Sequence, residues 1–216
     1  MTHGAPAPYI DTGIEYVPNS YAYQSGRWFK FGSKGMSLPA FKVNDDTIIY
    51  VLNIMGGDAD QIIYFSNDLI YGFIQAFGKK FLDNIEGVIS AEGKSIPLVY
   101  QIACDINRPY TILRKSCKPY MGEKVLSTKI KTITTDEQQD LYLDNKYLDI
   151  LVGKNLLFVD DVISSGATLN ACEKIVGMVG GRIVACMSVA IEGNYKPTLP
   201  TFSLGKLPII RLMKDV

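Results

Sequence analysis

The chain has 216 residues, 47% hydrophobic and 20% charged, a composition that predicts one globular unit with a sizeable core. Its 22 Lys and Arg residues balance its 22 Asp and Glu residues, which argues against nucleic acid or an anionic membrane as a partner. The sequence has no apolar run of the roughly 18–20 residues that span a bilayer and no secretory signal, so we expect a cytoplasmic protein.

Cysteine and histidine content excludes several catalytic classes. The four cysteines are scattered without a C-x-x-C pair, so the sequence indicates neither a zinc site nor a disulfide framework. We expect reduced thiols. The one histidine, His3, lies in the N-terminal tail, which removes Ser-His-Asp and Cys-His mechanisms.

The N-terminal part of the chain differs from the rest in composition and periodicity. Residues 1–45 are rich in Gly, Pro, Ser and aromatic residues and show little periodicity, so we expect an N-terminal extension that forms a hood region, followed by a core over residues 46–216. The segment 47–52 is rich in Ile, Val and Tyr and predicts a strand. Asp58 then caps a predicted helix whose apolar residues follow the 3.6-residue period.

Strands and helices alternate along the rest of the chain. This alternation predicts an α/β fold with a Rossmann-like, doubly wound parallel sheet and helices on both of its faces. Ligands of such sheets bind at the carboxyl ends of the strands. The expected strands lie at 87–90, 110–114, 156–159, 183–191 and 209–212. Helices are expected at 96–104 and, after the strand at 156–159, up to about 179, and a hairpin is expected over 125–133 and 140–143.

The segment 156–168 is the most informative one in the chain. An apolar strand ends at Asp160 and Asp161, and a hydroxyl-rich loop of five small residues follows. Backbone N–H groups of such a loop, with the positive end of the next helix, form a phosphate cradle, and Gly166 leaves room for a ligand to approach. Because acids repel phosphate, we expect the two aspartates to hold ribose hydroxyls or a Mg²⁺ ion. The pattern predicts a sugar 5-phosphate bound by Ser164, Ser165, Gly166, Ala167 and Thr168.

This stretch resembles the phosphoribosyl-pyrophosphate (PRPP) signature of the type I phosphoribosyltransferases. The resemblance extends over residues 86–193 and includes Ile191-Glu192 after the next strand; the spacing from Arg114 to Asp160 is most similar to that of xanthine phosphoribosyltransferases. It implies the fold of that family, in which the parallel sheet carries a small hood subdomain and a flexible β-hairpin loop. It also implies that the paired acids and the loop after them bind PRPP.

A second short motif, Glu92-Gly93-Lys94-Ser95, opens the next predicted helix and ends as a nucleotide-binding P-loop does. That motif needs four residues between its glycines, whereas Gly87 and Gly93 enclose five, so a kinase interpretation fails. The segment resembles the pyrophosphate loop of adenine phosphoribosyltransferases, with Gly93, Lys94 and Ser95 standing where that family has Ala, Arg and Gly. The resemblance implies that Glu92, Gly93, Lys94 and Ser95 bind pyrophosphate.

Three cations follow the strand after this motif: Arg114, Lys115 and Lys118. A solvated basic turn is one interpretation, but a leaving group with several negative charges requires such a cluster. In the family, similar cations approach pyrophosphate at a dimer interface, so the resemblance implies a homodimer. The polar segment 121–142 corresponds to the hairpin that closes over PRPP in these enzymes and excludes water.

The base site lies outside the region of resemblance. Trp28 and Phe29 are candidates for stacking on a purine, with core packing as the alternative. The sequence therefore predicts a purine phosphoribosyltransferase of xanthine or adenine type, which makes a nucleoside 5′-monophosphate and pyrophosphate. Its cofactor would be Mg²⁺, held mainly through PRPP rather than by a protein metal site. An orotate or other-base enzyme and a non-catalytic PRPP-binding regulator remain open.

Overall fold

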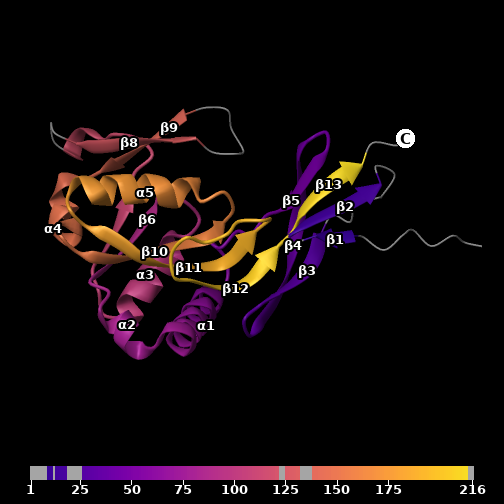
Figure 1. Ribbon diagram of the computed structural model, residues 1–216, viewed down its shortest axis with the longest axis horizontal. Helices are drawn as coiled ribbons and strands as arrows, with labels where there is room; N and C mark the ends of the chain where they lie inside the picture. The colour runs from indigo at the N-terminus through magenta and orange to yellow at the C-terminus, as the bar shows by residue number, and fades with distance from the viewer. Residues whose placement is uncertain (1–8, 12, 19–25, 122–124, 132–137, 214–216) are drawn as a thin grey trace, which may run out of the picture.

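The computed structural model describes residues 9–11, 13–18, 26–121, 125–131 and 138–213, so His3 lies outside it. A parallel sheet with helices on both faces forms one end of the molecule, and a mostly antiparallel sheet extends from the other end (Figure 1). Among the described residues no helix is long and apolar enough to cross a bilayer.

The parallel sheet confirms the predicted fold class. Its strand order is β12-β11-β10-β6-β7, and every neighbouring pair is parallel. The edge strand β12 escaped prediction because its sequence, TFSLGKL, has neither an apolar run nor a clean alternation. The bounds are Gly87–Ala91 for β6, Tyr110–Leu113 for β7, Asn155–Ile163 for β10, Arg182–Glu192 for β11 and Thr201–Leu207 for β12.

Side chains of β10 alternate between two cores, as the period of a strand requires. Leu157 and Val159 lie in the core with α1 and α3, whereas Leu156 and Phe158 lie in the core with α5. All four are fully buried, and each contributes about 1.5–3 kcal/mol by leaving water. The main helices are α1 (Ala59–Phe77), α3 (Ile96–Asp105) and α5 (Ala167–Met178); α2 (Lys79–Asp83) and α4 (Leu148–Leu151) are short, and 3₁₀ turns cover Pro119–Met121 and Asn145–Tyr147.

The second sheet, which we call the hood sheet, has the order β1-β2-β13-β5-β4-β3. It shows that the N-terminal region of low periodicity forms strands. Two of its strands, β5 and β13, come from beyond residue 45, where we predicted the boundary between hood region and core. The domain boundary itself stays a prediction. The bounds are Tyr9–Asp11 for β1, Ile14–Pro18 for β2, Gly26–Phe31 for β3, Lys34–Asn44 for β4, Thr47–Tyr50 for β5 and Ile209–Met213 for β13.

Packing and hydrogen bonds anchor the hood sheet to α1. Phe31 of β3 and Leu38 of β4 are buried in the same core as Phe65 of α1. In the β3–β4 turn, the backbone N–H and the hydroxyl of Ser33 each donate to Oδ2 of Asp68, at 2.7 Å. The hood sheet therefore has a fixed position beside the parallel sheet.

The predicted hairpin is present. Strands β8 (Leu126–Lys131) and β9 (Gln138–Leu143) pair antiparallel and lie over α5 (Figure 1). An isolated bridge between Arg114 and Tyr142 ties the hairpin to the end of β7. Residues 122–124 and 132–137 of the segment expected to cover PRPP lie outside the described residues.

Candidate active site

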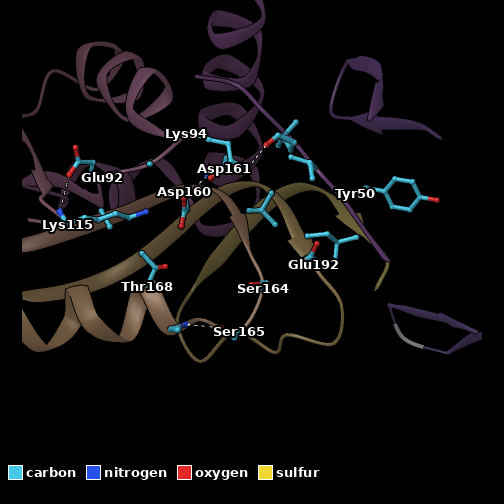
Figure 2. A pocket seen from close by; sticks show the side chains of 17 residues that line it. Tyr50, Glu92, Lys94, Lys115, Asp160, Asp161, Ser164, Ser165, Thr168 and Glu192 are labelled. Carbon is cyan, nitrogen blue, oxygen red and sulfur yellow. Dashed lines mark hydrogen bonds and ion pairs between the residues drawn. The ribbon is translucent and has the colours of Figure 1, made fainter. Parts of the chain in front are cut away.

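A cavity of about 310 Å³ opens at the carboxyl ends of β6 and β10 and reaches the end of β5 (Figure 2). This is the edge of a parallel sheet at which ligands bind. Ten of the residues predicted from the sequence line it: Glu92, Gly93, Lys94, Lys115, Asp160, Asp161, Ser164, Ser165, Ala167 and Thr168.

The loop before α5 encloses a second, smaller cavity of about 30 Å³, which shares Asp160 and most of the loop with the large one. Gly166 precedes the first turn of α5. The first N–H groups of a helix have no acceptor within the helix and carry its positive dipole end, so they attract an anion. The hydroxyl of Ser165 accepts from the N–H of Ala167 at 3.3 Å. The geometry suits a small tetrahedral anion.

The glycine in this loop has a structural reason that the sequence did not reveal. The backbone of Gly166 is left-handed, with φ of +74°, and a Cβ there would lie 2.7 Å from the ring of Tyr195. Gly166 therefore permits the turn and the close packing of Tyr195, and its part in ligand approach stays a prediction.

The paired acids belong to β10, which continues through Ile163 instead of ending at Val159 as the apolar run suggested. Because consecutive side chains in a strand alternate, they face different sides of the sheet. Asp161 Oδ2 lies 3.8 Å from Lys94 Nζ, whereas the Asp160 carboxylate accepts from the N–H of Asp161 at 2.9 Å. Burial, followed by the charge of Asp161, raises the pKa of Asp160 well above its ordinary value. Hydroxyl donors or a cation at this pair would stabilise both carboxylates.

Glu92 organises the cationic turn. Its carboxylate pairs with Arg114 at 3.1 Å and accepts from the backbone N–H of Lys115 at 3.0 Å. Lys115 lines the cavity, but Arg114 and Lys118 are not among its lining residues. The N–H of Lys118 donates to Met121 Sδ at 3.3 Å in the following 3₁₀ turn. An acid in a predicted anion site thus has a clear role, which is to hold two cationic residues in place.

The segment after β6 joins the two sheets. Lys94 Nζ donates to the carbonyl oxygen of Leu52 at 3.0 Å, besides its ion pair with Asp161. Ser95 is fully buried, and its hydroxyl lies 3.2 Å from that of Ser90. The structure therefore brings Lys94 into the cavity and leaves the Ser95 side chain behind its wall.

The aromatic residues that we expected at the base site do not line the cavity. Trp28 is 73% exposed on β3. Phe29 packs edge-on against Tyr50, with ring centroids 4.8 Å apart, under the guanidinium of Arg27. The lining residues on this side are instead four consecutive ones at the end of β5: Ile49, Tyr50, Val51 and Leu52. Only the position of this strand end beside the parallel sheet identifies them, and the sequence does not give that position.

Glu192, at the end of β11, also lines the cavity. Burial raises the pKa of Glu192 to about 7, although the positive charge of Lys94 opposes the shift. The pair Ile191-Glu192 was noted in the sequence for its resemblance to the family, but the residue was not assigned to the site. Its position, as an acid at the carboxyl end of a predicted strand of the parallel sheet, would have identified Glu192 as a site residue.

Known proteins share both the sequence and the fold. No protein-family model matches the chain. The hypoxanthine/guanine phosphoribosyltransferase of Methanococcus voltae is 28% identical over 138 residues, which cover 64% of this chain and 70% of that protein. The xanthine phosphoribosyltransferase of Clostridium botulinum is 29% identical over 132 residues, which cover 60% of this chain and 67% of that protein. The structure of adenine phosphoribosyltransferase from Saccharomyces cerevisiae, complexed with an imino-altritol bisphosphate and adenine, covers 83% of this chain and 94% of its own, with a TM-score of 0.58 and 16% identity.

Fold and site together define an α/β protein whose parallel sheet presents paired acids and a hydroxyl-rich loop at one edge. The sequence relatives are phosphoribosyltransferases, and the structural neighbour has the same fold. In sequence and in fold the chain is similar to the type I phosphoribosyltransferases, the family that the signature in residues 156–168 predicted.

Proposed function

We propose that the protein transfers the 5-phosphoribosyl group of PRPP to a purine base, which yields a nucleoside 5′-monophosphate and pyrophosphate. One observation carries the proposal: a single cavity joins an anion-binding loop, a pair of carboxylates and an apolar wall at Tyr50, in the order in which a nucleotide presents phosphate, ribose and base. The purine phosphoribosyltransferases among the relatives support this substrate class.

The reaction breaks the bond between C1 of the ribose and the pyrophosphate oxygen and forms a bond from C1 to a ring nitrogen of the base, which loses its proton. We assign the loop 164–168 to the 5′-phosphate. Asp160 and Asp161 would hold the two ribose hydroxyls and lie near the sugar as it gains positive charge. Positioning and charge compensation supply the catalysis, with no covalent protein intermediate.

The pyrophosphate would lie against the segment after β6. Gly93 and Lys115 line this part of the cavity. Lys94 contributes positive charge from its place beside Asp161. Glu92 acts as a positioning residue because it holds the cationic turn in place.

Mg²⁺ fits the chemistry of the site as an ion held mainly through PRPP. Within the described ranges there is no group of three or more His, Cys, Asp or Glu residues that could hold a metal alone. The carboxylate oxygens of Asp160 and Asp161 are ligands that Mg²⁺ prefers. Burial, and then the charge of Asp161, raises the pKa of Asp160, and a cation beside the pair would stabilise both ionised acids. When bound, the ion supplies charge neutralisation of the leaving pyrophosphate.

We further propose a homodimer in which the cationic turn of one chain, with Lys118, approaches the site of the other. The position of Lys118 outside the cavity of its own chain supports this. Mixing Lys118→Ala chains with Asp161→Asn chains should then restore activity above that of either variant. Sedimentation as a strict monomer would refute the dimer.

The four free cysteines support a reducing compartment, the cytoplasm.

The direct test is pyrophosphate release from PRPP and Mg²⁺ with adenine, guanine, hypoxanthine, xanthine and orotate in turn. We expect turnover with at least one purine. Release with orotate alone would replace the purine assignment. PRPP binding without release for any base would support the regulator instead.

A further inference from the structure

The cavity has one end that the phosphate groups and the ribose do not use. The loop 164–168 lies on one side and Lys115 on another, while Tyr50 and Glu192 lie together at the end next to the hood sheet (Figure 2). Tyr50 is held there by its edge-on contact with Phe29. This end therefore remains for the base.

The chemistry of Glu192 restricts what it can bind. A carboxylate repels phosphate and pyrophosphate, and the ribose hydroxyls already have Asp160 and Asp161. Glu192 lines the same cavity as the apolar residues Ile49 and Val51, and a partly buried acid there needs a hydrogen-bond donor. Of the parts of the reactants, only the base offers N–H donors there.

We infer, building on the proposed function, that Glu192 selects the base by accepting hydrogen bonds from two adjacent N–H groups on its edge, while Tyr50 contacts the ring. A planar carboxylate suits two parallel N–H donors. Guanine presents a ring N–H beside an amino group. Hypoxanthine presents a ring N–H beside a carbonyl, xanthine separates its two N–H groups by a carbonyl, and adenine places its amino group beside an acceptor nitrogen. The geometry therefore favours 2-amino-6-oxopurines.

The charged surroundings are compatible with a carboxylate in this place. Lys94, from the turn before α3, attracts Glu192, while Asp161, from β10, repels it. Burial raises the pKa of Glu192 to about 7, with Lys94 opposing the shift and Asp161 adding to it. Binding of a two-donor edge stabilises the ionised form, whereas a donor–acceptor edge is equally satisfied by the protonated acid.

Titration calorimetry with GMP and IMP tests the inference, since the two nucleotides differ only in the 2-amino group. Glu192→Gln replaces one acceptor by a donor, so GMP affinity should fall about 10- to 100-fold while IMP affinity changes less than about threefold. Glu173→Gln, an acid-to-amide change on α5 outside the cavity, is the matched control and should leave both affinities unchanged. An unchanged GMP-to-IMP ratio in Glu192→Gln overturns the inference.

A measurement on the unaltered protein makes the test independent of how the variants fold. The GMP-to-IMP affinity ratio should rise between pH 6 and 8 as Glu192 ionises; the 5′-phosphate is common to both ligands and cancels. A flat ratio overturns the inference. A Glu192-dependent preference for GMP without pyrophosphate release for any base would refute the proposed function alone, whereas turnover with an unchanged ratio would refute the inference alone.

Discussion

The two ends of the cavity are assembled from the chain in different ways. The phosphate end comes from one continuous stretch, residues 160–168, in which the end of β10, a loop and the first turn of α5 follow each other. The base end joins Tyr50 of the hood sheet to Glu192 of the parallel sheet. A local motif carries its geometry in its own backbone, whereas the base end depends on how two sheets pack. We therefore expect variants at one end to leave binding at the other unchanged.

The largest effect is expected at the phosphate end, from Gly166→Ala. The left-handed backbone costs a Cβ about 1–2 kcal/mol, and displacement of the Tyr195 ring costs about 1–3 kcal/mol more. Gly153→Ala is the control, since Gly153 has φ of +67° but open space around it. Chemical denaturation should show a clearly larger loss of unfolding free energy at residue 166. Equal losses would mean that the contact with Tyr195 has no energetic weight.

Asp161→Asn should come next. Loss of a charge-assisted hydrogen bond costs about 1.5–3 kcal/mol, which is roughly a 10- to 150-fold fall in PRPP-dependent turnover. Asp149→Asn, on the exposed surface of α4, controls for the chemical change alone. Steady-state kinetics with PRPP varied is the measurement, and turnover equal to that of the control would remove the paired acids from the mechanism.

The base end is tested by Tyr50→Ala against Trp28→Ala. Contact between an aromatic ring and a base is worth about 1–3 kcal/mol, so the Tyr50 variant should raise the KM for the base about 5- to 150-fold while the KM for PRPP stays constant. Because Trp28 is exposed, Trp28→Ala should leave both the KM for the base and the KM for PRPP unchanged. If Tyr50→Ala raised the KM for PRPP by the same factor, the two ends of the cavity would not be independent.

The smallest effect concerns the pH dependence of stability. The folded-state pKa of Glu192, about 7, lies above the ordinary value of 4.5, so the folded protein binds the extra proton between these values and loses stability as the pH rises through that window. Relative to Glu192→Gln, the wild type should lose about 1–2 kcal/mol between pH 4.5 and 8, allowing for partial exposure. Parallel stability curves in urea would contradict the assigned burial.

The same difference between the two ends explains which parts of the site could be predicted from the sequence. The strand, the acids and the loop of residues 156–168 are adjacent in the chain, so their composition predicted their geometry. For Glu92, the sequence identified the motif but not the role of the residue, since its partner Arg114 lies just after another strand, β7. Trp28 and Phe29 were chosen by residue type, and the true neighbours of the cavity emerged only once β5 was placed in the hood sheet. Long-range sheet packing is what local patterns do not contain.

A crystal structure with bound GMP tests the account most directly. We predict that the 5′-phosphate lies in the small cavity enclosed by residues 164–168, the ribose hydroxyls at Asp160 and Asp161, and the base between Tyr50 and Glu192. A phosphate bound elsewhere, or a base turned away from Tyr50 and Glu192 toward Lys115, would contradict it.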